Sequence, residues 1–267
     1  MNIVIGVVVF VLGTAIGSFL NVVIYRLHAG GSPLRGRSRC PHCKHQLAAD
    51  DLIPVLSFVM LRRRCRYCHK PISWQYPLVE LSMGLVALTM MLRYGLSVES
   101  WVGTVLGAFL LVIFVYDLRH QLILDRVSIP AMVAALLGSL LLKRPLTDIA
   151  IGGVAGAAFF FLQYVFSNGR WIGGGDIRLG AVLGLALGWK LLAVSLVLAY
   201  FGGSTVALFL ILTKRRSWSS QIPFGTFLSL AGIVTFLWGN EILVWYLHGG
   251  FFDWFVGAFL RFYNPAV

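Results

Sequence analysis

Residues 98–119 read VESWVGTVLGAFLLVIFVYDLR, an apolar run long enough to cross a bilayer that ends on a carboxylate, Asp117. A second carboxylate, Asp176, follows glycines 173–175 and lies between further apolar runs. The chain has only ten acidic residues in 267, and an acid at a membrane boundary is costly unless it is paired or functional. These two aspartates are therefore the first candidates for a chemical site.

The composition is that of a membrane protein. Apolar residues make up 58% of the chain, charged residues only 12%, and the mean hydropathy is +0.84. A water-soluble protein of this length could not bury so much apolar surface, so we expect an all-α multi-pass membrane protein. Apolar windows predict about eight transmembrane helices, near 2–25, 76–95, 98–116, 127–142, 148–166, 178–189, 191–212 and 222–240.

The two ends of the chain carry apolar segments of a different kind. The first window has no basic residues before it and no small-residue cleavage site after it, so we expect a retained helix, not a signal peptide. The last segment, 242–260, is either an additional span or an interfacial helix. Its aromatic residues and the His-Gly-Gly interruption at 248–250 favour the interface.

The basic residues predict the orientation. If the amino terminus is outside, 17 of the 22 Lys and Arg residues fall in the cytoplasmic loops, which are 26–75, 117–126, 167–178 and 213–221. This topology brings Asp117 and Asp176 to the same cytoplasmic face, with Asp125 beside them and Glu80 one turn inside the second helix. The basic loop could suggest nucleic acid, but beside a membrane helix the positive-inside rule explains it, with attraction to anionic lipid as a secondary effect.

All four cysteines lie in the long cytoplasmic loop. They form two Cys-x-x-Cys pairs, Cys40 with Cys43 and Cys65 with Cys68, which is a spacing suited to a tetrahedral Zn²⁺ site. A loop of this size builds little core alone, so structural metal would supply folding energy. Disulfides and a redox pair are the alternatives, and a reducing cytoplasm argues against disulfides. The flanking histidines are not needed as ligands, because four thiolates complete the shell.

Two carboxylates at one membrane face suit proteolytic chemistry. Asp117 and Asp176 can share a proton, so that one activates water while its protonated partner supports the carbonyl oxygen. Gly173, Gly174 and Gly175 would let the backbone approach a substrate strand closely. The structural alternative is that Asp176 only caps a helix beginning at Ile177, and that Asp117 pairs with Arg119 or Arg178.

The chain resembles the bacterial type IV prepilin peptidases, the bifunctional leader peptidase and N-methyltransferase family, over roughly residues 13–230. The resemblance is carried by both Cys-x-x-Cys pairs, the Asp117 segment, and the stretches GSFLNVVIYRL (17–27), IPVLS (53–57), YPLVEL (76–81), GGGD (173–176) and PFG (223–225). It implies an enzyme of the bacterial cytoplasmic membrane that serves type IV pilus or type II secretion systems.

By position, the resemblance makes Asp117 and Asp176 the catalytic pair, cutting prepilin leaders after a glycine at the cytoplasmic face. It makes the four cysteines structural zinc ligands and S-adenosylmethionine the methyl donor for the new amino terminus. Asp125 would support catalysis, and Glu80 would belong to the methyl-transfer region. The implied domains are the first helix (1–25), a zinc-binding domain (26–75), a GxGD-type aspartyl protease domain (76–240) and a carboxy-terminal helix (241–267).

The chain departs from the family pattern at a few positions, including His28, Leu52, Gln75 and Arg178. None of them alters the aspartate pair, but Leu52 and Gln75 lie where methylation is expected. Three other functions are therefore kept open. They are a peptidase without methyltransferase activity, a proton-coupled transporter, in which acids line a transport path, and a non-enzymatic assembly factor in which the acids are structural.

Overall fold

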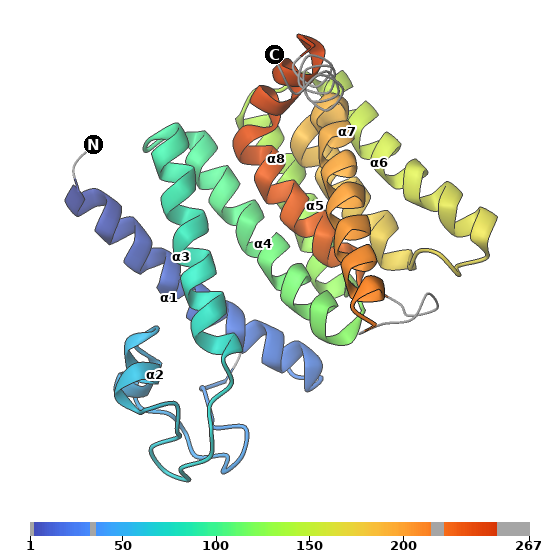
Figure 1. Cartoon of the computed structure of the whole chain (residues 1–267). Helices are drawn as coiled ribbons and strands as arrows, with labels where there is room; N and C mark the ends of the chain where they lie inside the picture. The colour runs from blue at the N-terminus through green and yellow to red at the C-terminus, as the bar shows by residue number, and fades with distance from the viewer. Residues whose placement is uncertain (1–2, 33–35, 215–221, 250–267) are drawn as a thin grey trace, which may run out of the picture.

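The computed structural model describes residues 3–32, 36–214 and 222–249. Within these ranges the secondary structure is helical apart from two isolated β-bridges, which confirms the all-α class. The helices are α1 (Ile3–His28), η1 (Ala49–Leu52), α2 (Leu56–Met60), α3 (Gln75–Tyr94), α4 (Val98–His120), α5 (Asp125–Leu141), α6 (Leu146–Ser167), α7 (Gly174–Leu212) and α8 (Phe224–Leu247), drawn in Figure 1.

Six of the described helices are long and apolar enough to cross a membrane: α1, α3, α4, α6, α7 and α8. The multi-pass prediction is thereby confirmed. α5 has 17 residues and is charged only at its start, where Asp125 and Arg126 lie. α8 continues through residue 241, where a break was expected, and ends at Leu247, so the start of the predicted 242–260 segment belongs to α8. The rest of that segment lies outside the described residues.

The 39 residues of α7 form two helical segments joined at Gly188. Its φ of 74° and ψ of 171° are non-helical and lie where an L side chain is strained. Tyr200 donates a 2.8 Å hydrogen bond to Oε1 of Gln163, although a helix continuing straight on would carry Tyr200 about 18 Å beyond Gly188. The chain therefore turns back at Gly188, close to the predicted boundary between the helices 178–189 and 191–212.

Glycines let α6 and the first segment of α7 pack at backbone contact. A Cβ atom at Gly184 would overlap the carbonyl oxygen of Gly152, and one at Gly156 would overlap the carbonyl oxygen of Gly180. Small residues at helix interfaces are the usual means of close packing between apolar helices in a bilayer. This contact fixes the position of the GGGD turn along the axis of α6.

The remaining helices close around the first segment of α7. α8 packs against α4 and α7, α5 packs against α7, and α1 packs against α3 on the opposite side of the bundle. Figure 1 shows the cysteine loop, which connects α1 to α3, at the same end of the molecule as the end of α4 and the start of α8. One end of the bundle thus collects the candidate functional residues.

Candidate active site and metal centre

Asp117 lies in the last turn of α4 and is 5% exposed. Its Oδ2 accepts two hydrogen bonds from Thr226, one from the backbone N–H at 2.7 Å and one from the hydroxyl at 3.1 Å. Because Thr226 belongs to the first turn of α8, the carboxyl group satisfies a backbone donor that the helix itself leaves unpaired. Sequence reasoning gave Thr226 no role, although it directly follows the PFG stretch.

Asp176 is the third residue of α7 and is 8% exposed. Its Oδ2 accepts the backbone N–H of Gly173 at 3.1 Å, which makes it part of the helix cap. The capping alternative is therefore only partly correct, because the N-cap is Gly173, the helix begins at Gly174 and not at Ile177, and Asp176 bonds back to the cap from within the first turn. The other oxygen, Oδ1, is buried and has no hydrogen-bond partner among the described residues. That second oxygen is therefore not used by the helix cap.

Ile123 connects the two carboxyl-bearing turns. A Cβ at Gly175 would lie 2.6 Å from Cβ of Ile123, and a Cβ at Gly225 would lie 2.8 Å from its Cδ1 and 2.9 Å from Oδ2 of Asp117. The structure thus brings Asp117 and Asp176 together, close enough for their carboxyl groups to interact electrostatically. Nothing in the sequence singled out Ile123, since its part depends on the packing of three chain segments.

The basic residues considered as partners of Asp117 have other partners. Arg178 forms a 2.5 Å ion pair with Asp125 and donates to the carbonyl oxygen of Ile123 at 3.4 Å. Arg119 donates to the hydroxyl of Ser73 at 3.3 Å. The alternative in which Asp117 pairs with Arg119 or Arg178 is therefore not found among the described residues, because both guanidinium groups have other partners. Asp125 instead ties the start of α5 to α7.

Glu80 lies apart from the aspartate pair, on the side of α3 that faces the cysteine loop. It is 6% exposed, and its Oε2 accepts the backbone N–H of Val55 at 2.7 Å. Val55 has a φ of 60°, so this bond holds a strained loop residue against the helix. Gly17 on α1 allows the close approach, because a Cβ there would lie 2.7 Å from Cα of Glu80.

The four cysteines form one cluster. Their Sγ atoms all lie within 4.8 Å of one another, and Cys40 and Cys68 are 3.9 Å apart. Tetrahedral Zn²⁺ with Zn–S bonds near 2.3 Å requires S–S distances of about 3.8 Å, so the cluster fits such an ion. Four thiolates would hold the metal as a closed structural site. It would add folding energy to the loop without an open position for substrate.

The two cysteine turns have the same local structure. The N–H of Cys40 donates to the carbonyl of His45 and the N–H of Cys65 to that of Lys70, both at 2.9 Å. Burial alone would raise the pKa of the Cys40 thiol, but backbone N–H groups of the turn and neighbouring thiols lower it to about 7. Thiolate is the form that binds metal. The rings of His45 and Tyr67 pack against each other with centroids 3.7 Å apart and a tilt of 31° between their planes.

The fold and this arrangement of side chains define the class: a helical membrane protein with paired buried aspartates beside a four-cysteine module. Two family models match the chain, the bacterial peptidase A24 N-terminal domain over residues 11–94 and the type IV leader peptidase family over residues 104–211. The chain belongs to the type IV leader peptidase family.

Curated relatives agree along nearly the whole chain. Proteins named prepilin leader peptidase/N-methyltransferase from Aeromonas hydrophila and Pseudomonas putida are each 34% identical, over 90% and 87% of this chain and 92% and 90% of theirs. One of the same name from Myxococcus xanthus is 37% identical over 79% of this chain and 64% of its own. No solved structure matches the chain significantly.

Proposed function

We propose that this protein is a membrane aspartyl endopeptidase that removes the leader peptide of type IV prepilins or pseudopilins and N-methylates the new amino terminus with S-adenosylmethionine. The observation that carries the peptidase proposal is the pair of buried carboxyl groups supplied by two helix ends. Their hydrogen bonds to the described residues all go to Oδ2, so Oδ1 of each remains for water and substrate.

Asp117 and Asp176 are the proposed catalytic pair. Sharing one proton, one carboxylate takes a proton from water while the protonated partner donates to the scissile carbonyl oxygen. The pair titrates as a unit, so the base is not assigned to one member. The bonds from Thr226 and Gly173 keep both groups oriented before substrate arrives, which removes part of the ordering cost from the reaction.

Three residues of the turn and one neighbour have supporting roles in this proposal. Gly174 has open space where a Cβ atom would lie, which suits main-chain pairing with an unwound substrate segment, and Gly173 and Gly175 flank it. Asp125, through Arg178, holds the start of α5 against the turn. An extended substrate could lie along this turn with its scissile bond near the carboxyl groups.

The proposed topology has about eight crossings, with α5 and both segments of α7 each crossing once and the amino terminus outside. It places the aspartate pair and the loop 26–75 at the cytoplasmic face of the bacterial inner membrane. The reversal at Gly188 supports this count, because it returns the chain to the end of the bundle where α8 begins. The loop is the proposed zinc-binding domain, with Cys40, Cys43, Cys65 and Cys68 as ligands.

The test is cleavage of a prepilin peptide, consisting of a glycine-ended leader and the following hydrophobic helix, by protein in liposomes. Asp117→Asn and Asp176→Asn should each lose cleavage, and Asp50→Asn, at an exposed loop acid, is the matched control. Mass spectrometry of the product with S-adenosylmethionine present should show the addition of one methyl group. Full cleavage by both aspartate variants would refute the peptidase proposal. It would favour the alternative functions, a transporter or an assembly factor.

A further inference from the structure

The cysteine loop has an exposed apolar face on and just before α2. Five aliphatic side chains within residues 52–60 are each more than one third exposed: Leu52, Ile53, Leu56, Val59 and Met60. Met60 is the most exposed of them, at 72%. Positions 56, 59 and 60 have the i, i+3, i+4 spacing of a single helix face. A contiguous exposed apolar face of this kind indicates a surface that binds something.

The opposite side of α2 packs inward, against the point where the chain enters α3. Phe58 is buried, and the centroid of its ring lies 5.1 Å from that of Trp74. Trp74 is the N-cap of α3, which is long and apolar enough to cross a membrane. Tryptophan is enriched at the level where helices enter a bilayer. The contact therefore places α2 beside the membrane entry point of α3.

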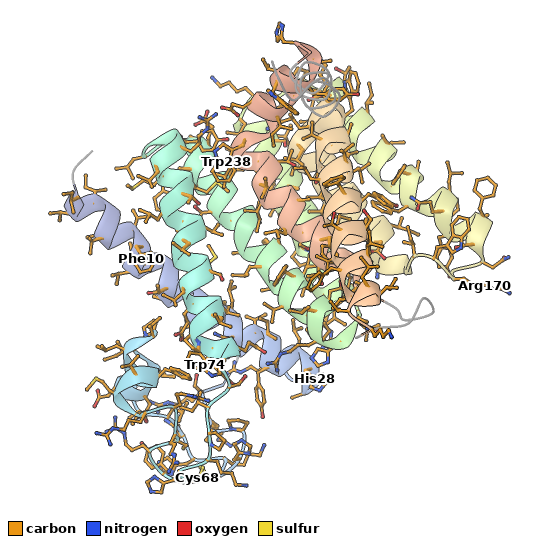
Figure 2. The ribbon with its side chains drawn as sticks, in the orientation of Figure 1. Phe10, His28, Cys68, Trp74, Arg170 and Trp238 are labelled. Atoms are coloured by element: carbon orange, nitrogen blue, oxygen red, sulfur yellow. The ribbon has the colours of Figure 1, made fainter. Side chains whose placement is uncertain are left out.

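A hydrogen bond fixes the start of α2 at a level inside α3. The N–H of Val55, which directly precedes α2, donates to Oε2 of Glu80 at 2.7 Å. Glu80 lies about 8 Å along the helix axis from Gln75, the first residue of α3. The interfacial layer on each side of a bilayer is about 5–8 Å deep. Figure 1 shows α2 beside the start of α3, and Figure 2 shows Cys68 farther from the bundle. The apolar face therefore lies at the level of the bilayer interface.

Positive charge follows the apolar face directly. Arg62, Arg63 and Arg64 are all exposed, and none of them forms an ion pair with another residue that the structure describes. Cζ of Arg63 lies 4.7 Å from the centroid of the Trp74 ring. Apolar side chains bordered by arginines and a tryptophan are typical of segments that lie in the interface of an anionic membrane.

We propose that the exposed face of α2 inserts into the interface of the membrane that α1 and α3 cross, and that Arg62, Arg63 and Arg64 bind the phosphates of anionic phospholipids. The aliphatic side chains lose their exposed surface among the upper acyl chains. Guanidinium groups donate paired hydrogen bonds to phosphate oxygens. The bilayer thereby holds the cysteine loop against the helices from outside. The proposal does not depend on the proposed function, because it requires only that α1 and α3 span the membrane.

The first test identifies what touches the face. The full-length protein, with Met60 replaced by the photo-crosslinker benzoylphenylalanine, is placed in nanodiscs of equal phosphatidylglycerol and phosphatidylcholine. Irradiation should attach phospholipid to the peptide containing position 60, with the anionic lipid in about threefold excess or more, because three arginines lie next to the face. The same replacement at His42, an exposed residue of the first cysteine turn, should attach none. A crosslink from position 60 to a second protein chain, or equal lipid adduct at both positions, would overturn the proposal.

The second test separates charge from apolar contact, with the photo-crosslinker kept at position 60. Arg62→Gln combined with Arg64→Gln should bring the two lipids in the adduct toward equal amounts, while a lipid adduct persists. Lys44→Gln combined with Lys70→Gln removes the same charge from the two cysteine turns and should keep the anionic excess. An unchanged excess in the arginine variant, or an equal loss in both variants, would refute the phosphate contacts.

Discussion

At the scale of single residues, the two aspartates differ in how their carboxyl groups are oriented. Asp176 bonds to the cap of its own helix, whereas Asp117 bonds to the first turn of a helix 109 positions away. Asp176 is therefore oriented by local sequence, since a carboxylate three residues after an N-cap reaches back to the cap N–H. Asp117 has its geometry only if α4 and α8 pack correctly. The position of α8 thus determines the orientation of the Asp117 carboxyl group.

Thr226 provides the test of this dependence. Thr226→Val removes the 3.1 Å hydroxyl bond but keeps the side-chain shape and the backbone N–H bond. We expect kcat/KM for prepilin cleavage to fall about 10- to 100-fold, since a hydrogen bond to a charged group contributes about 1.5–3 kcal/mol. Thr226→Ser keeps the hydroxyl and should retain activity within about threefold of wild type. Equal activity of the Val and Ser variants would contradict the orienting role.

At the scale of elements, the glycines of α6 and α7 decide how closely the two helices approach. Gly184 packs directly on the backbone of Gly152, whereas Gly202, in the second segment of α7, has its nearest neighbour, Phe227, 4.0 Å from an added Cβ. A methyl group is therefore excluded at one glycine of α7 and accommodated at another. Intrinsic helix propensity favours alanine at both, so any loss must come from packing.

Gly184→Ala should lower the free energy of unfolding by about 2–3 kcal/mol, because it overpacks a backbone contact. Thermal unfolding in detergent, followed by circular dichroism, measures this change. Gly202→Ala is the matched control and should leave the midpoint unchanged or slightly raised. A similar loss in both variants would mean that helix packing at Gly184 is not the cause.

The cysteine loop is the other element for which we make a prediction, because we expect its folding to depend on bound metal. Removing metal with a chelator should unfold residues 36–74 while leaving the helices intact, because four thiolates supply the folding energy of this small module.

Cys65→Ser should lose metal, measured as zinc per protein by atomic absorption, and Ser57→Ala in the same loop should keep it. Metal affinity should also fall as pH decreases, because protons compete for the thiolates. Zinc bound at full stoichiometry by Cys65→Ser would contradict the ligand assignment.

At the scale of the whole molecule, one end of the bundle carries everything that the proposed chemistry needs. The last turn of α4 separates the aspartate pair from a cavity of about 590 Å³ that lies between α1, the cysteine loop and the start of α3. Figure 2 places His28 at the end of α1 near this turn, and its ring stacks on that of His120 with centroids 4.1 Å apart.

The orientation of this end is testable with reporter fusions. Alkaline phosphatase fused after Arg144, in the turn between α5 and α6, should be active because the enzyme matures only outside the cytoplasm. Fused after Arg170, in the turn before α7, it should be inactive. The expectation follows from the excess of Lys and Arg in the loops assigned to the cytoplasm. The reverse pattern would invert the topology and place the aspartates outside.

The sequence by itself determined the membrane class, the two aspartates as the residues of interest, and the four cysteines as one possible metal set. These conclusions depend on composition and short spacings, which are local properties of the chain. Only the tertiary structure decided that Asp117 is held by Thr226, that Arg178 pairs with Asp125, and that Glu80 faces a separate cavity. Asp117 and Thr226 are 109 positions apart in the sequence, Asp125 and Arg178 are 53 apart, and the cavity is lined by several elements at once. Uniformly apolar helices do not reveal which faces pack together, so no periodicity in the sequence could have predicted them.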